Sequence, residues 1–77
     1  MSIDERSIYM PNYAWYYLDR GSDTCYWCYS NEMSATEFAS VVTDKIGKRI
    51  FAADTSCASN SQDLKRHKEY ARNSVHV

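Results

Sequence analysis

The sequence has few of the aliphatic residues from which small domains usually build a core. Leu, Ile, Val and Phe together account for only 12 of the 77 residues, a share that is typical of disordered chains when the net charge is also high. The formal net charge is only -1, however, and seven tyrosines and two tryptophans supply large apolar side chains. We therefore expect one folded domain, residues 1–77, with an aromatic core.

Several other features are also missing. The sequence has no run of 18 apolar residues, and the stretch from Met1 to Arg6 is too polar and acidic for a signal peptide. The three cysteines are an odd number, so free thiols are expected rather than a disulfide framework. We expect a cytoplasmic chain that does not enter a membrane.

The clearest local signal predicts a helix over residues 35–46. Ser34 can cap the helix with its hydroxyl group, Glu37 can accept from the amide of Ser34, and Met33 can pack on Phe38 across the cap. Gly47 suits the end of the helix. Apolar residues then recur at helical spacing along one stripe, which predicts an amphipathic helix that covers a sheet.

Residues 13–30 contain two aromatic runs separated by turn residues, which predicts a β-hairpin. A loop centred on Gly21 and Ser22 places three cross-strand pairs on one face: Leu18 with Cys25, Tyr16 with Trp27, and Ala14 with Tyr29. The other face then carries Trp15, Tyr17, Tyr26 and Cys28. Because the first face looks more like core, we expect Trp15, Tyr17 and Tyr26 to stay exposed.

The rest of the chain completes a small α+β domain of order ββαβα. The apolar run at residues 49–53 predicts a third strand, and Asn60 with Asp63 can cap a last helix over about 62–73. We expect a small antiparallel sheet packed by the helix at 35–46. Residues 1–12 are compatible either with a short capped turn or with a strand that ends at Pro11.

Cys25 and Cys28 have the spacing of a zinc half-site, which Cys57 with His67 or His76 could complete. Positions i and i+3 of a strand point to opposite faces, however, and a second pair of ligands at short spacing is missing. A zinc-binding module therefore remains a second alternative, and we expect neither a metal nor a cofactor. The sequence also has no set of residues that would indicate an enzyme.

Charge is unevenly distributed, since residues 1–44 sum to -5 and residues 45–77 to +4. The predicted last helix carries four basic residues: Lys65, Arg66, Lys68 and Arg72. Together with aromatic rings on a sheet, they could bind single-stranded nucleic acid. The acidic hairpin half repels phosphate, so this function is the alternative rather than the main hypothesis.

Tyrosine and tryptophan dominate the energetics of protein interfaces. We therefore expect a non-enzymatic protein-binding module that acts by occlusion, with Trp15, Tyr17 and Tyr26 and the four basic residues of the last helix as partner-binding residues. The expected partner is a host protein or protein complex. A chain of this class would suit a phage or mobile-element inhibitor of a host nucleic-acid machine, such as an anti-CRISPR, anti-restriction or transcription inhibitor. Its near-zero charge and exposed rings would also suit a homodimer.

Overall fold

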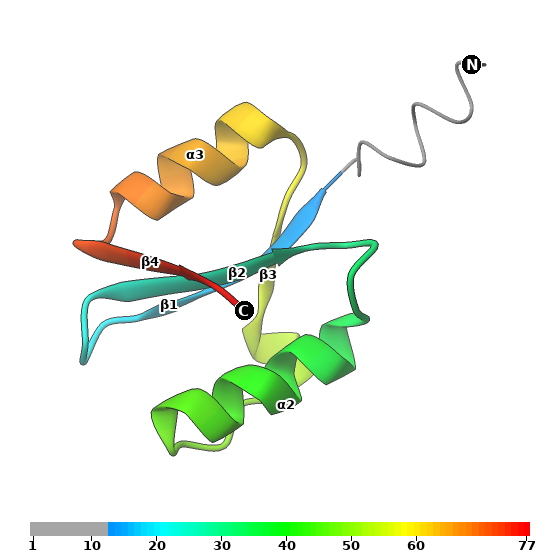
Figure 1. Cartoon of the computed structure of the whole chain (residues 1–77), viewed down its shortest axis with the longest axis vertical. Helices are drawn as coiled ribbons and strands as arrows, with labels where there is room; N and C mark the ends of the chain where they lie inside the picture. The colour runs from blue at the N-terminus through cyan, green and yellow to red at the C-terminus, as the bar shows by residue number, and fades with distance from the viewer. Residues whose placement is uncertain (1–12) are drawn as a thin grey trace.

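The computed structural model describes residues 13–77, which form an α+β fold with a four-stranded mixed sheet and two α-helices (Figure 1). The strand order is β3-β1-β2-β4. This confirms the expected fold class. Both interpretations of residues 1–12 lie outside the described residues.

The hairpin consists of β1 (Ala14–Asp19) and β2 (Thr24–Tyr29), and its register is the predicted one. The carboxylate of Asp19 accepts hydrogen bonds from the amide of Gly21 and the hydroxyl group of Ser22. Asp23 has a φ of 53°, in the left-handed region that Asp tolerates better than most residues. The side chains of the turn thus close the loop at the point where the sequence predicts it.

Helix α2 (Ala35–Ile46) begins at the predicted capping box, in which Ser34 and Glu37 bond to each other's backbone amides. It ends at Gly47, which has a φ of 71° and donates its amide hydrogen to the carbonyl oxygen of Thr43. Phe38, Ala39 and Val42 form its buried stripe. Met33 packs against this cluster as expected, and its carbonyl oxygen accepts a hydrogen bond from the indole of Trp15.

The predicted strand at residues 49–53 is wrong. Thr43 bonds through its hydroxyl group to both backbone polar groups of Ile50, and the carboxylate of Asp54 accepts from the amide of Phe51. These side chains satisfy the backbone groups that a strand would pair, and a short 3₁₀-helix, η1 (Ala52–Asp54), follows. The third strand is instead β3 (Ser56–Ala58), within the segment that reads as a polar loop.

Helix α3 (Ser61–Glu69) begins at Asn60, whose side chain accepts from the amide of Asp63 as predicted, but it ends earlier than residue 73. The chain then forms a fourth strand, β4 (Asn73–His76), which pairs with β2 in parallel. The sheet is therefore mixed rather than antiparallel. Neither helix is long and apolar enough to span a membrane, as far as residues 13–77 are concerned.

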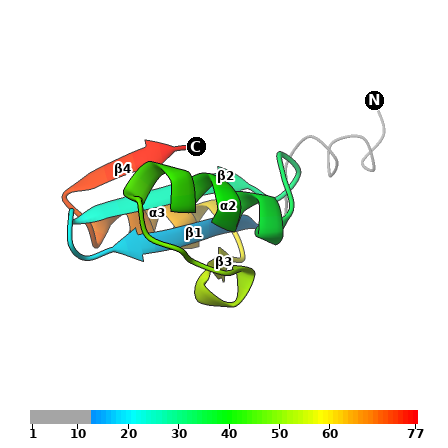
Figure 2. The ribbon, with the colours of Figure 1, turned by 90° about the horizontal axis from the view of Figure 1, so that it is seen from below.

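The two helices lie on opposite faces of the sheet (Figures 1 and 2). Helix α2 covers the face of Trp15, Tyr17, Tyr26 and Cys28, together with Ile50. Helix α3 covers the face of Ala14, Tyr16 and Trp27, against which Leu64 and Ala58 pack. The expectation that only one face of the hairpin is covered is therefore wrong, because a different helix covers each of its two aromatic faces.

Candidate protein-binding surface

The three hairpin rings expected at an exposed patch lie under α2. Trp15, Tyr17 and Tyr26 are half-buried and pack against the cluster of Phe38 and Val42. Their exposure was predicted on the argument that the opposite face is the core, and this is wrong because both faces are core. Trp15 also uses its indole N–H on the carbonyl oxygen of Met33, at 2.8 Å. These rings therefore stabilise the fold and leave little surface for a partner.

The rings on the other face have stacking partners of their own. Tyr16 stacks on His67 of α3 with 4.3 Å between ring centroids, and its hydroxyl oxygen lies 3.2 Å from the His67 Nε2. Trp27 stacks on His76 of β4 at 4.1 Å, and the Lys68 Nζ lies 4.3 Å from the Trp27 ring centroid. Lys68, one of the predicted partner-binding residues, is thus engaged in a cation–π contact at the edge of the core. Because these rings are already stacked, they offer no open platform for nucleotide bases.

Glu32 and His76 form a polar pair beside this stack that the sequence analysis missed. The two carboxylate oxygens of Glu32 lie 2.8 and 3.1 Å from the His76 Nε2, and one of them accepts from the amide of Tyr29 at 2.7 Å. Partial burial raises the pKa of Glu32, but the Tyr29 amide and His76 outweigh it and hold this pKa below its ordinary value of 4.5. The pair ties β4 to the loop that follows β2.

The cysteines do not converge on one point. The register places Cys25 and Cys28 on opposite faces of β2, and Cys57 lies on β3, with all three thiols free. Burial raises the pKa of Cys25 to about 11, slightly offset by Lys68, and it raises the pKa of Cys28 to about 12, with Glu32 adding to the shift. Among residues 13–77, no group of three or more His, Cys, Asp or Glu side chains could hold a metal ion. The candidate zinc ligands thus lie apart.

The remaining basic residues form the exposed side of α3 and the turn after it. Lys65, Arg66 and Arg72 are exposed, and Tyr70 at the end of the helix is 63% exposed. Arg66 pairs with Asp63, and the Arg72 Nε lies 3.8 Å from a carboxylate oxygen of Asp23. We call Lys65, Arg66, Tyr70 and Arg72 the α3 surface.

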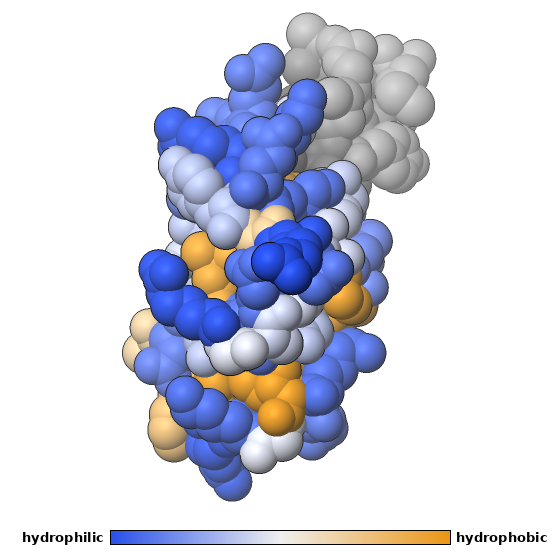
Figure 3. Space-filling view, turned by 90° about the vertical axis from the view of Figure 1, so that its left-hand side faces the viewer, coloured by the Kyte–Doolittle hydropathy of each residue, from blue (hydrophilic) through white to orange (hydrophobic). Residues whose placement is uncertain are grey.

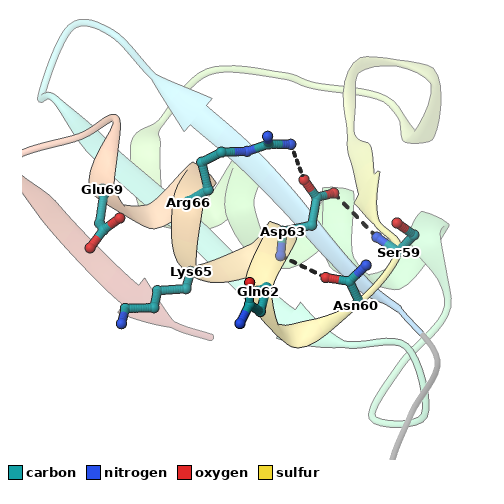
Figure 4. Close-up of a pocket in the computed structure, with 7 residues that line it drawn as sticks. All are labelled: Ser59, Asn60, Gln62, Asp63, Lys65, Arg66 and Glu69. Atoms are coloured by element: carbon teal, nitrogen blue, oxygen red, sulfur yellow. Dashed lines mark hydrogen bonds and ion pairs between the residues drawn. The ribbon is translucent and has the colours of Figure 1, made fainter.

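Two hollows lie near this surface. An open hollow of about 800 Å³, lined by seven polar residues, runs along α3, where Asp63 bonds to Ser59, Asn60 and Arg66 (Figure 4). Gln62, Lys65 and Glu69 lie along another side of the helix (Figure 4). A cleft of about 190 Å³ lies between the β1–β2 turn and Tyr70, which is below the usual size of ligand pockets, about 300 to 1,000 Å³. Because the larger hollow is open and lined by polar residues, and the other is small, this geometry suits contact with a large partner better than enclosure of a small molecule.

Viewed from the side that carries the β1–β2 turn, the molecule is mostly hydrophilic, and its hydrophobic areas are small and separate (Figure 3). Among the described residues, four large apolar side chains are exposed: Tyr13, Tyr29, Phe51 and Tyr70. Of these, Tyr70 lies closest in sequence to the basic residues of α3.

No family model, curated protein or solved structure matches this chain.

Proposed function

We propose that this chain is a non-enzymatic protein-binding module that acts by occlusion, and that it contacts its partner through the α3 surface. The observation that carries the proposal is the combination of Arg66, Tyr70 and Arg72 as exposed side chains. Tyrosine and arginine are enriched among the residues that dominate interface energies, because they bring large area together with directional hydrogen bonds. The proposal thus transfers the contact from the hairpin rings to α3.

The charge of this segment favours an acidic partner. Residues 61–72 carry four basic and two acidic side chains, and one acidic group, Asp63, is already paired with Arg66. An acidic surface on the partner would complement the remaining positive charge, raise the association rate and fix the orientation of the complex. We propose a host protein or protein complex as the partner.

The biological class is a further part of the proposal. A short chain that binds a protein surface without a cofactor would suit a phage or mobile-element inhibitor of a host nucleic-acid machine, which it would block by covering a functional surface. This step rests on the class of protein and not on a motif. Inhibition by occlusion requires only affinity and bulk, and both can come from one exposed helix on a rigid sheet.

Single-stranded nucleic acid remains the alternative ligand. The basic residues of α3 could neutralise phosphates, although the stacked rings of Tyr16 and Trp27 leave no sheet surface for base stacking. Binding that depends on phosphate contacts falls steeply with salt. Titration of labelled oligonucleotides at two salt concentrations therefore separates the alternative from the main proposal.

The test uses two variants matched in charge and in exposed aromatic area. Lys65→Glu with Tyr70→Ala alters the α3 surface, whereas Lys45→Glu with Phe51→Ala makes the same changes near α2, where Phe51 is 60% exposed. Both variants and the wild type would be immobilised for affinity capture from host lysate. We expect a protein that the wild type and the α2 variant retain and the α3 variant loses. Equal retention by both variants would refute the role of the α3 surface.

A further inference from the structure

The outer edge of β4 is an unpaired strand edge. The sheet order places β4 at one end, and none of the described residues pairs with its outer side. In Figures 1 and 2, β4 lies along the edge of the sheet, with α2 and α3 above and below the sheet rather than beside the strand. An open edge presents a row of donors and acceptors to which another strand can pair.

The hydrogen bonds of β4 show which of its groups point outward. The amide of Asn73 donates to the carbonyl oxygen of Asp23 at 3.0 Å, and the amide of Val77 donates to that of Trp27 at 2.9 Å. Backbone groups alternate in direction along a strand, so the amides and carbonyls of Ser74 and His76 point away from β2. The edge thus carries two outward donors and two outward acceptors.

Apart from its short length of four residues, β4 lacks the usual protections against edge pairing. Natural edge strands carry lysine, proline, bulges or inward-facing charges that prevent association. The sequence Asn73-Ser74-Val75-His76 has no proline and no lysine, arginine or acidic residue.

We propose that the outer edge of β4 pairs with β4 of a second copy of this chain. A two-fold axis perpendicular to the sheet at Val75 makes the strands antiparallel and places Ser74 opposite His76 of the second copy. Each outward amide then meets an outward carbonyl, which gives four backbone hydrogen bonds, and the two Val75 side chains face each other on the α2 side. The two sheets become one continuous sheet of eight strands, with both α3 helices on the same face.

The charges at the two ends of β4 complement each other in this arrangement. Arg72 precedes the strand, and its side chain is 84% exposed although its Nε lies 3.8 Å from Asp23; at the other end Glu32 lies 2.8 Å from His76 and is itself partly exposed. Antiparallel pairing brings Arg72 of each copy to the Glu32 end of the other. A strand from an unrelated protein has no reason to carry this match at both ends, so the second copy is the occupant that the charges favour.

The contact is short, so the dimer should be weak and concentration-dependent. Sedimentation velocity of the wild-type chain up to about 1 mM should show the apparent mass rise from 8.9 kDa toward twice that value. Arg72→Glu should weaken association about two- to tenfold. A constant monomer mass over the whole range would overturn the proposal, whatever the fate of the α3 surface.

Cross-linking tests the register. In a Cys57→Ser background, Val75→Cys brings two thiols together across the axis, at a separation that a disulfide can bridge. The matched control is Ser74→Cys, which faces His76 rather than itself. Mild oxidation with copper phenanthroline should link the Val75→Cys chains at least about tenfold faster than the control. Equal rates, or faster linking of the control, would overturn the register.

Discussion

Replacement of Leu64 by alanine tests how α3 is held on the sheet. Leu64 is 4% exposed and is the buried residue of α3, where it packs against Ala14, Trp27 and Ala58. Leu→Ala substitutions in cores cost about 2 to 5 kcal/mol, and the cost is larger where the cavity cannot collapse. The cavity left by Leu64→Ala would be lined by strand residues that the sheet holds in place, so it should not collapse. We therefore expect the free energy of unfolding to fall by about 3 kcal/mol or more. For a domain of this length, whose stability is about 4 to 12 kcal/mol, this is a large fraction.

Guanidinium unfolding followed by far-UV circular dichroism and tryptophan fluorescence measures the loss. The midpoint should fall strongly, and the tryptophan emission should shift to the red because α3 no longer shields Trp27. Lys65→Ala, the exposed neighbour, is the control and should change the stability by about 0.5 kcal/mol or less. A loss below about 1 kcal/mol for Leu64→Ala would show that α3 is not anchored through this side chain, and the α3 surface would then lack its rigid support.

Three further predictions follow from other parts of the fold. Gly47→Ala should cost about 1 to 2 kcal/mol in urea unfolding, because Gly47 has a φ of 71° although the new Cβ would meet nothing within 4 Å. Iodoacetamide should label Cys57 in the native protein, because it is exposed although burial and Asp63 raise its pKa, and should spare the buried Cys25 and Cys28; mass spectrometry that finds three labels without denaturant would contradict this. Because the pKa of Glu32 is lowered on folding, its carboxylate contributes stability above pH 4.5 that is lost in acid, so the stability difference between wild type and Glu32→Gln should shrink below this pH.

The sequence was sufficient where backbone geometry is fixed by neighbouring side chains. The capping box at Ser34, the left-handed glycine at 47 and the Asn60 cap are local devices, and each is present as predicted. The hairpin register followed from the position of its turn, since the loop length decides which residues face each other. These elements can be predicted from residues that are close to one another in the sequence.

Strand β4, which the sequence did not predict, forms because of tertiary contacts. Its four residues have little strand propensity apart from Val75, and the helix was predicted to extend to about residue 73. Two contacts across the sheet decide the outcome instead: the stack of His76 on Trp27 and the packing of Val77 against the α2 cluster. The alternation of polar and apolar residues from Ser74 to Val77 was the available signal.

The error about the exposed rings has a quantitative cause. With only 12 aliphatic or phenylalanine residues, the chain has to bury both faces of its aromatic hairpin to form a core, and one helix covers only one face. A single helix on one face would have left the rings of the other face, about half of them, exposed to water. The sequence predicted a second helix, but its charged residues outnumber its apolar ones and hide the importance of Leu64.

The small number of residues that anchor α3 and β4 explains why the candidate surfaces lie on these two elements. The contacts that hold helix α3 on the sheet include Leu64, His67 and Lys68, and its exposed side carries charge and Tyr70. Strand β4 is held by one neighbouring strand, and its outward groups at Ser74 and His76 have no partner among the described residues. Substitutions at exposed positions of these elements, which make few contacts, should not unfold the domain. The α3 variant and the Val75→Cys chain therefore test binding and pairing separately, because each alters an element that the other leaves intact.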